Sequence, residues 1–143
     1  METLHYLLMK AYTNLNRWLM AQASILGLSP GQPKILECLI QNGEVNQKAI
    51  ASSCEIEPAT VGSILSRMER DGLVRRRQRN GDRRSLYVSL TPRGDALGRQ
   101  MMELFHQADT RAAALLSPQE QAQLLSLLNK VCTAVQPEEE AVQ

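Results

Sequence analysis

A change of hydrophobic period near residue 72 is the feature that most constrains how this chain folds. The stretch PATVGSILSRMERDGL, which begins at Pro58, places apolar residues at the spacing of an amphipathic helix, and Gly72 ends it. Over residues 73–90 apolar and polar residues alternate instead, and Asn80-Gly81 supplies a turn signal. We therefore expect a helix over 58–71 followed directly by a β-hairpin.

The residues before this unit predict two more helices close together. Ser29 is a favourable N-cap, Pro30 suits the first helical position and Gln32 completes a capping box, so a helix is expected over about 30–41. A short helix is expected over about 47–53. Helices joined by such short connections and followed by a hairpin have the layout of a winged helix-turn-helix.

Longer helices are expected on both sides of this core. An apolar stripe runs from Leu4 to about residue 25, and the pairs Thr91-Pro92 and Ser117-Pro118 each begin a further helix. A compact winged domain does not cover the apolar stripes of such long helices, which predicts a homodimer. The two later helices supply the residues expected in the dimer interface: Leu97, Met101, Leu104, Phe105, Leu115, Leu116, Leu124, Leu125, Leu128 and Val131.

The chain has 143 residues, which is the size of a single domain. We expect a mainly α fold with a small β-hairpin, in which residues 29–91 form the winged helix-turn-helix. Residues 1–27 and 92–136 are the expected dimerisation helices, and residues 137–143 are an acidic tail.

Positive charge is concentrated in one segment, although the formal net charge is only +1. Between Arg67 and Arg84 eight arginines stand against three acidic residues, and no lysine is present. Charged edge strands and plain surface runs also produce such patterns. Arginine without lysine favours a nucleic acid, because the planar guanidinium suits bidentate phosphate contacts and a narrow minor groove.

The helix over 58–71 has one apolar side and one side of mostly small residues. The apolar side is formed by Val61, Ile64, Leu65 and Met68. The opposite side holds Ala59, Gly62, Ser63, Ser66 and Arg70, with Thr60 and Arg67 at one flank. An ordinary surface helix also explains this pattern, at a cost of about 1 kcal/mol for a glycine. Beside an arginine-rich hairpin we favour DNA, with hydroxyls at base edges and arginines at phosphates.

The motifs LSPGQPKILECL, IASSCEIEPATVGSILSRMERDGLVRR and GDRRSLYVSLTPRG resemble the MarR family of bacterial transcription regulators in order and spacing. The similarity spans nearly the whole chain. Its most specific part is the D-x-R and V-x-L-T-x-x-G run over residues 82–94. The resemblance implies an intertwined dimer whose fourth helix enters the major groove while the hairpin wing reaches the minor groove.

The resemblance and the charge pattern together predict the residues at the DNA. The resemblance implies Gln47, Lys48, Pro58, Ala59, Thr60, Gly62, Ser63, Arg67 and Arg84. The charge pattern adds Arg70, Arg75, Arg77, Arg79 and Arg83. Arg84 is expected in the minor groove, with Asp82 holding its guanidinium extended. Glu57 departs from the small residue that the family often has before this helix; it suits the helix dipole but opposes DNA binding.

The hairpin tip is expected to be an odd-numbered loop. A two-residue turn at Asn80-Gly81 would pair Val74 with Tyr87 and place Val74 on the face opposite Val88. Keeping Val74 on the core face requires a tip of three or five residues with Asp82 near its apex. The outward-facing side chains are then Arg75, Arg77 and Arg79, with Arg83 and Arg84 at or beside the tip.

Members of the family commonly respond to small phenolic or anionic compounds bound between the dimer helices and the winged domain, or to cysteine oxidation. Candidate effector-binding residues are Tyr12, Arg17 and Trp18, with His106 across a dimer, because they combine apolar walls with a cation. Ordinary helix packing with a solvated arginine explains these four residues equally well.

The three cysteines are expected to have different surroundings. Cys38 and Cys54 lie among apolar positions and are expected to fill the core, since buried cysteine behaves as a small hydrophobe. Cys132 is either an interface residue or an accessible thiol. The first helix has no cysteine, which weighs against a peroxide sensor.

Other function classes find little support. No Ser/His/Asp arrangement, phosphate-binding glycine loop or carboxylate pair favours an enzyme. His5 and His106 with three scattered cysteines give no zinc spacing, and no cofactor is expected. No signal peptide and no membrane-spanning apolar run is apparent, so a cytoplasmic protein without a membrane partner is expected.

The expected function is that of a sequence-specific regulator, with double-stranded DNA, a second copy of the chain and a small aromatic or anionic effector as partners. A repressor binding a pseudo-palindromic operator is favoured. Two alternatives stay open: a thiol-based redox regulator of the same fold, and a winged-helix protein-interaction module that does not bind DNA.

Overall fold

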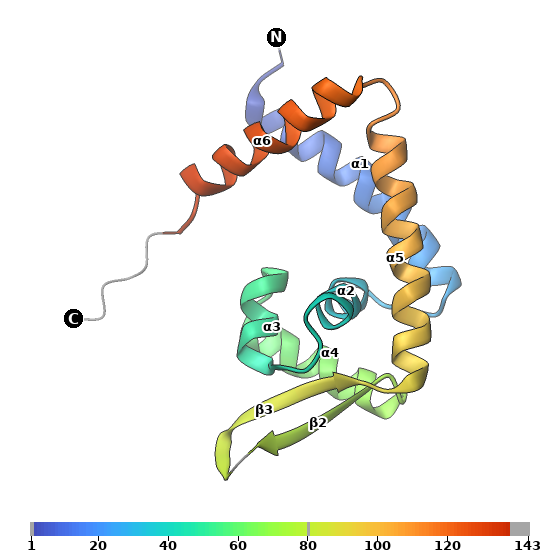
Figure 1. Ribbon diagram of the computed structural model, residues 1–143, viewed down its shortest axis with the longest axis vertical. Helices are drawn as coiled ribbons and strands as arrows, with labels where there is room; N and C mark the ends of the chain where they lie inside the picture. The colour runs from blue at the N-terminus through green and yellow to red at the C-terminus, as the bar shows by residue number, and fades with distance from the viewer. Residues whose placement is uncertain (1, 80, 138–143) are drawn as a thin grey trace, which may run out of the picture. The chain divides into compact units, whose positions relative to one another are not determined.

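The computed structural model describes residues 2–79 and 81–137, except for the side chains of residues 82–84. The elements are α1 (Leu4–Ile25), α2 (Gln32–Asn42), β1 (Val45–Asn46), α3 (Gln47–Cys54), α4 (Pro58–Arg70), β2 (Val74–Arg79), β3 (Asp82–Leu90), α5 (Pro92–Ala112) and α6 (Pro118–Ala134), and Figure 1 labels all of them except β1. This order confirms the expected fold class, a winged helix-turn-helix with long flanking helices. Among the described residues, no helix is long and apolar enough to cross a membrane.

The chain divides by its internal contacts into two units, Met1–Ala108 and Asp109–Gln143. The first contains the elements from α1 to β3 and most of α5, and the second contains the end of α5 and α6. α6 begins with a capping box, as expected. The Ser117 hydroxyl accepts from the Glu120 N–H, and the Glu120 carboxylate accepts from the Ser117 N–H. The domain boundaries expected from the sequence stay predictions.

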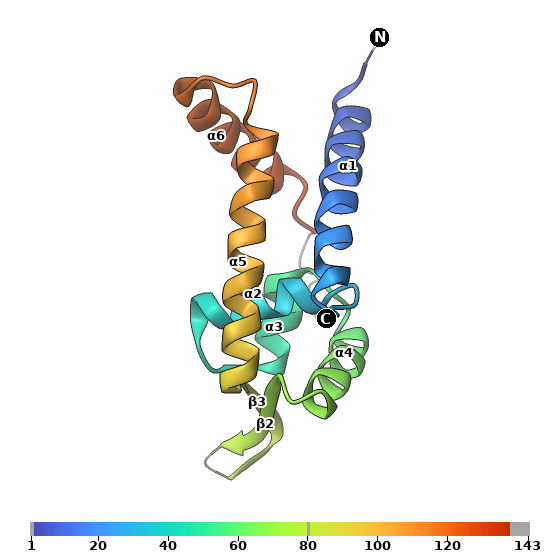
Figure 2. The ribbon, with the colours of Figure 1, turned by 90° about the vertical axis from the view of Figure 1, so that its right-hand side faces the viewer.

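The core of the first unit lies between α2, α3, α4 and the inner face of the hairpin. In Figure 2 the hairpin extends away from these three helices. The largest fully buried side chains are Ile35, Leu36, Ile50, Leu65, Met68, Met101, Val61, Val74 and Val88. Cys38 and Cys54 are buried in the same cluster, as expected.

The sheet has three strands in the order β1-β3-β2, one more strand than the sequence predicts. β1 pairs with β3 through Val45 opposite Val88 and Asn46 opposite Tyr87. Two residues are too few to show an alternating pattern, so the sequence does not predict β1. Its position matters because it connects the first turn of α3 to the wing.

The hairpin keeps Val74 on the core face, as predicted. Val74 pairs with Leu90 and Arg76 with Val88, and both valines are buried. The other face of β2 carries the predicted outward side chains, all exposed: Arg75, Arg77 and Arg79.

The predicted hairpin tip is wrong. The register shifts between Gln78 and Arg79, so that Arg79 pairs with Asp82 and Asp82 begins β3 instead of standing at an apex. Residues 83–85 of β3 lie between paired positions, whereas no residue lies between Gln78 and Arg79. This irregularity in one strand supplies the offset that we had assigned to an odd-numbered loop. Asn80, which belongs to the tip, lies outside the described residues.

α2 begins at Gln32, two residues later than predicted. Gly31 precedes it with φ of 87°, a left-handed conformation that a helix starting at Pro30 does not contain. The predicted contact of the Gln32 side chain is nevertheless present, since its Oε1 accepts from the Ser29 N–H at 3.0 Å. A Cβ at Gly31 would lie 2.7 Å from Cδ1 of Ile64, so the turn packs tightly against α4.

α5 packs into the chain's own core, which corrects part of the expected dimer interface. Met101 is fully buried, and the apolar side chains of Leu97, Leu104 and Phe105 pack against the same cluster. Met101 fails as an interface prediction because the winged domain itself covers it, whereas Leu97, Leu104 and Phe105 are half-buried in the single chain and stay interface predictions. On α6, by contrast, Leu124, Leu125 and Leu127 are exposed, and so is Leu115 before it.

Candidate nucleic-acid interface

α4 exposes the side that the sequence predicts to meet DNA. Val61, Leu65 and Met68 are buried. The exposed residues include Pro58, Ala59, Thr60, Ser63, Ser66, Arg67 and Arg70. The hydroxyls of Ser63 and Ser66 donate to the carbonyls of Ala59 and Gly62 at 3.3 and 2.9 Å, so both lie along the helix instead of projecting from it. The exposed side therefore has few side chains that project from the helix, and Arg67 and Arg70 lie in the last turn of α4.

α3 approaches α4 closely at Gly62. Asn46 caps α3, with its side chain accepting from the Ala49 N–H at 2.7 Å, and Gln47 is the first helical residue. Gly62 is half-buried, and a Cβ there would lie 3.3 Å from Nε2 of Gln47. The absence of a side chain at Gly62 thus gives Gln47 room. Gln47, Lys48 and Pro58 line a small hollow of about 250 Å³ together with β3.

Arg76 connects the wing to both of these helices. Its guanidinium donates to Ser66 Oγ at 2.9 Å, to Glu69 Oε1 at 3.4 Å and to Gln47 Oε1 at 3.5 Å. Its backbone N–H donates to Glu69 Oε2 at 3.1 Å, and only 17% of its side chain is exposed. We had not predicted Arg76 as a DNA contact, and in the structure its side chain is directed to α3 and α4.

Two of the outward-facing arginines have partners within the chain. Arg77 donates to both carboxylate oxygens of Glu44, at 2.9 and 2.7 Å. These hydrogen bonds hold the pKa of Glu44 below its ordinary value and raise the pKa of Arg77. Arg79 lies over the ring of Tyr87, 5.3 Å from its centre. Both arginines must leave or share these partners to reach a phosphate.

Four other cationic side chains of the predicted interface have no partner among the described residues. Lys48, Arg67, Arg70 and Arg75 are exposed, and their side chains have no hydrogen bond or ion pair with another described residue. The side chains of Asp82, Arg83 and Arg84 lie outside the described residues, so their predicted roles stay predictions. α4 and the base of the wing thus present three arginine side chains, those of Arg67, Arg70 and Arg75, that have no partner in the described part of the chain.

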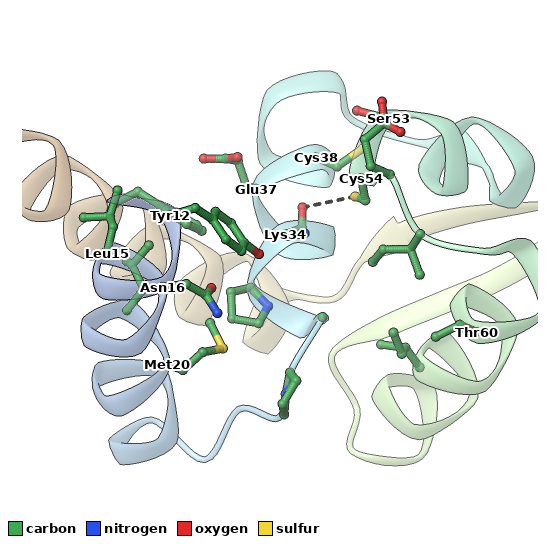
Figure 3. Close-up of a pocket in the computed structure, with 18 of the residues that line it drawn as sticks. Tyr12, Leu15, Asn16, Met20, Lys34, Glu37, Cys38, Ser53, Cys54 and Thr60 are labelled. Carbon is green, nitrogen blue, oxygen red and sulfur yellow. Dashed lines mark hydrogen bonds between the residues drawn. The ribbon is translucent and has the colours of Figure 1, made fainter. Parts of the chain in front are cut away.

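A cavity of about 690 Å³ lies behind the recognition helix (Figure 3). Its wall comes from α1, from α2 with the preceding turn, from the end of α3, from α4 and from α5. The side chains of Thr60 and Ile64 belong to this wall, so α4 faces both the cavity and the proposed DNA side. The cavity is bordered by apolar groups and by the charged side chains Lys34, Glu37 and Glu55.

One of the four predicted effector residues lines this cavity. Tyr12 points toward it from α1 in Figure 3. Arg17, Trp18 and His106 are not among its lining residues within the described part of the chain, whereas Phe105 of α5 is. In the same part of the chain, no group of three His, Cys, Asp or Glu side chains gathers in a way that holds a metal ion.

Sequence reasoning missed Arg76 and Glu44 for different reasons. Alternation along β2 places Arg76 on the face of Val74, and this signal was available. Glu44 had no signal, because β1, which brings it beside the wing, is only two residues long. Phe105 lines the cavity wall, a contact that the sequence does not predict, and its place in a dimer interface stays a prediction.

Comparison with known proteins gives consistent results. Residues 28–86 match the model of the MarR family. The homoprotocatechuate degradative operon repressor of Escherichia coli is 34% identical over 104 residues, which are 72% of this chain and 70% of that protein. A MarR-family transcriptional regulator from Silicibacter pomeroyi has a TM-score of 0.82 at 28% identity, over 94% of this chain and 90% of that one. The S. aureus MepR–DNA complex shares the fold, with a TM-score of 0.86 at 23% identity, over 95% and 100% of the two chains.

Proposed function

This chain belongs to the MarR family of DNA-binding, winged-helix transcription regulators, and we propose that it is a repressor that binds a pseudo-palindromic operator as a homodimer and releases it when a small aromatic or anionic effector binds. The observation that carries the proposal is an exposed side of α4 made mostly of small residues, together with three arginines whose side chains have no partner among the described residues: Arg67, Arg70 and Arg75. The E. coli relative is by name a repressor, which supports repression over activation for this chain.

In this proposal α4 enters the major groove and the wing lies along the flanking backbone. Thr60 and Ser63 reach base edges, for which the Ser63 hydroxyl leaves the Ala59 carbonyl, while Arg67, Arg70 and Arg75 neutralise phosphates without giving up a side-chain partner among the described residues. The remaining proposed contacts are Gln47, Lys48, Pro58, Ala59, Gly62, Arg77, Arg79 and Arg83, with Arg84 in the minor groove and Asp82 orienting it.

A homodimer is supported by apolar surface that the single chain leaves uncovered. α1 buries only Leu19 and Ala23, and α6 buries no described residue. The exposed apolar side chains on α1 include Leu4, Leu7, Met9 and Tyr12. A two-fold dimer of winged domains requires half-sites about one helical turn of DNA apart.

The cavity behind α4 is the proposed effector site. An occupant that contacts Thr60 or Ile64 pushes on α4 directly and changes how that helix meets the major groove. Lys34 at the cavity wall suits a carboxylate, and Tyr12 and Phe105 suit an aromatic ring. The E. coli relative is named for a homoprotocatechuate operon, and homoprotocatechuate is an aromatic acid. Aromatic acids are therefore the first compounds to screen by thermal shift, with Tyr12→Ala expected to remove the response.

DNA binding is tested by the salt dependence of affinity for the DNA that flanks the chain's own gene. Fluorescence anisotropy is expected to give log K falling linearly with log[salt], by about 0.9 for each phosphate neutralised. Arg75→Ala is expected to reduce that slope by about 1. Arg99→Ala is the matched control, because Arg99 is exposed on α5 and paired with Asp95, and should leave the slope unchanged.

A flat salt dependence, or no binding to that DNA, would overturn the proposal and favour the protein-interaction module.

The family consists of transcription regulators, which are not enzymes. A cytoplasmic location is part of the same proposal, because the DNA target lies there. A thiol-based response is the alternative to a ligand-based one, and it would use Cys132, which is exposed, or one of the buried residues Cys38 and Cys54.

A further inference from the structure

Two thiols from different helices share one wall of the cavity. Cys38 lies on α2 and Cys54 is the last residue of α3, and both line the cavity although they are only 5% and 7% exposed. Figure 3 shows the two side chains between α2 and the end of α3. The third cysteine, Cys132 of α6, is exposed. It therefore serves as an internal control for any thiol chemistry at the other two.

The two sulfurs influence each other and have few other polar partners. Cys54 Sγ donates to the Lys34 carbonyl at 3.5 Å, and Asn42 Nδ2 donates to Cys38 Sγ at 3.8 Å. Burial, and then the charge of Cys38 and a hydrogen bond with it, raise the pKa of Cys54 to about 11. At neutral pH a charged Cys54 thiolate is therefore disfavoured, and this thiol is slow in reactions that need a free anion.

A ligand that takes both sulfurs and leaves no net charge avoids this cost of burying a charge. Trivalent arsenic that carries one organic group meets this requirement, because it bonds two thiol sulfurs in a neutral product. Zinc does not, because a structural zinc site takes four ligands, and the described residues offer no group of three.

We propose that Cys38 and Cys54 form a two-thiol site for a trivalent organoarsenical whose organic group occupies the cavity. The sulfurs supply the two bonds to arsenic, and both open into a space large enough for an aryl group. Apolar side chains from three other parts of the wall face the same space: Leu15, Leu19, Ile56 and Phe105. Burial of the aryl group against them adds a hydrophobic contribution that the exposed Cys132 does not offer.

The reaction with an arylarsine oxide balances without an added reagent. Two arsenic–sulfur bonds form, while both S–H bonds and the arsenic–oxygen bond break. The oxygen leaves as water with the two thiol protons. Arsenic stays trivalent and neither sulfur is oxidised, so no oxidant or reductant is required.

The test uses the full, reduced chain and phenylarsine oxide as the probe. Intact-mass measurement is expected to show one arsenical for each chain. N-ethylmaleimide labelling followed by peptide mapping is expected to show Cys38 and Cys54 protected and Cys132 labelled. A dithiol is expected to reverse the protection, whereas the same concentration of thiol groups from a monothiol is not. Protection of Cys132, or no adduct on the folded chain, would overturn the proposal.

Single substitutions provide a second readout on the same adduct. Cys38→Ser and Cys54→Ser are each expected to abolish the dithiol-reversible adduct, because one arsenic–sulfur bond is lost. Cys132→Ser, the matched control, is expected to keep it. An adduct that survives in either of the first two variants contradicts the assignment. The mapping experiment needs no substitution, so it decides the matter even if a core serine impairs folding. DNA binding enters neither experiment, and the site stands or falls independently of the repressor function.

Discussion

Arg76 is predicted to position the wing instead of contacting DNA. Its hydrogen bonds join β2 to Gln47, Ser66 and Glu69. Arg76→Ala removes the three guanidinium bonds and keeps the backbone one, and because the Glu69 side chain is itself 44% exposed we expect a loss of only about 1 kcal/mol in the free energy of unfolding. Urea unfolding measures this loss. Arg75→Ala is the matched control and is expected to leave stability unchanged, since the Arg75 side chain is exposed and bonds to no described residue, while the backbone pairing of β2 is kept.

The same two variants separate positioning from phosphate contact. Both are expected to weaken DNA binding. Arg75→Ala should also reduce the salt slope, whereas Arg76→Ala should lower affinity with the slope nearly unchanged, because no phosphate contact is lost. A slope that falls equally in both variants would place Arg76 at the DNA.

The ion pair of Glu44 is expected to stabilise the wing only outside the acidic range. Hydrogen bonds from Arg77 lower the pKa of Glu44 below its ordinary 4.5 in the folded chain. A lowered folded-state pKa gives stability that is present above pH 4.5 and lost as the pH falls through the lowered value. Melting curves should show Glu44→Gln less stable than the unaltered chain at neutral pH, with a difference that shrinks as the pH falls below 4.5. A difference that persists at the lower pH would assign the effect to packing.

At this scale, alternation alone was enough to place most arginines but not to identify their partners. It put Arg75, Arg77 and Arg79 on the outer face, where the structure has them. It gave no sign of Glu44, which lies 33 positions from Arg77 in the chain. The contact depends on a two-residue strand, and so short a strand leaves no periodic pattern to detect.

Among the elements, the junction between α5 and the wing tolerates the least change. A Cβ at Gly94 would overlap the carbonyl oxygen of Leu73, which is backbone and has little freedom to move. Gly94→Ala is therefore expected to displace α5 from the start of β2 and to cost roughly 3–5 kcal/mol of unfolding free energy, despite the better helix propensity of alanine. Chemical denaturation, or loss of soluble expression, measures this effect.

Gly98, one turn further along α5, is the matched control. A Cβ there would lie 2.9 Å from Cγ1 and 3.1 Å from Cδ1 of Ile40, a side chain that is able to rotate. Gly98→Ala is expected to cost less than half as much as Gly94→Ala. Equal losses would show that the backbone contact of Gly94 has no special role.

Most elements were predictable from local signals, and the exceptions share a cause. α3, α4 and α6 begin or end within a residue or two of their predicted bounds because caps and prolines mark them, and α1 does so because its apolar stripe marks it. α2 begins late because Gly31 adopts a left-handed conformation beneath Ile64. The hairpin tip differs from its prediction because an irregularity in β3, and not an odd-numbered loop, keeps Val74 on the core face. Tertiary packing decided both, and a single sequence does not display it.

For the whole molecule, the uncovered apolar surface of the terminal helices requires a partner. α6 has 17 residues and buries none that the structure describes. Isolated helices of this length gain little stability in water, so packing of an apolar face must supply it. The buried core explains the winged domain but does not account for these helices. A second copy of the chain is the partner that the proposed pseudo-palindromic operator implies.

Leu125→Glu tests this assembly. The Leu125 side chain is 66% exposed in the single chain, so a charge there is expected to leave the winged core intact but to prevent burial in an interface. Sedimentation is expected to show a dimer for the unaltered chain and a monomer for Leu125→Glu. Gln123→Glu, an exposed position on the same helix, adds the same charge without removing apolar area and should remain dimeric.

The monomer should also lose most of its affinity for a two-half-site operator while keeping weak binding to one half-site, because the second contact is no longer intramolecular. A monomeric unaltered chain, or a Leu125→Glu dimer, would remove α6 from the interface.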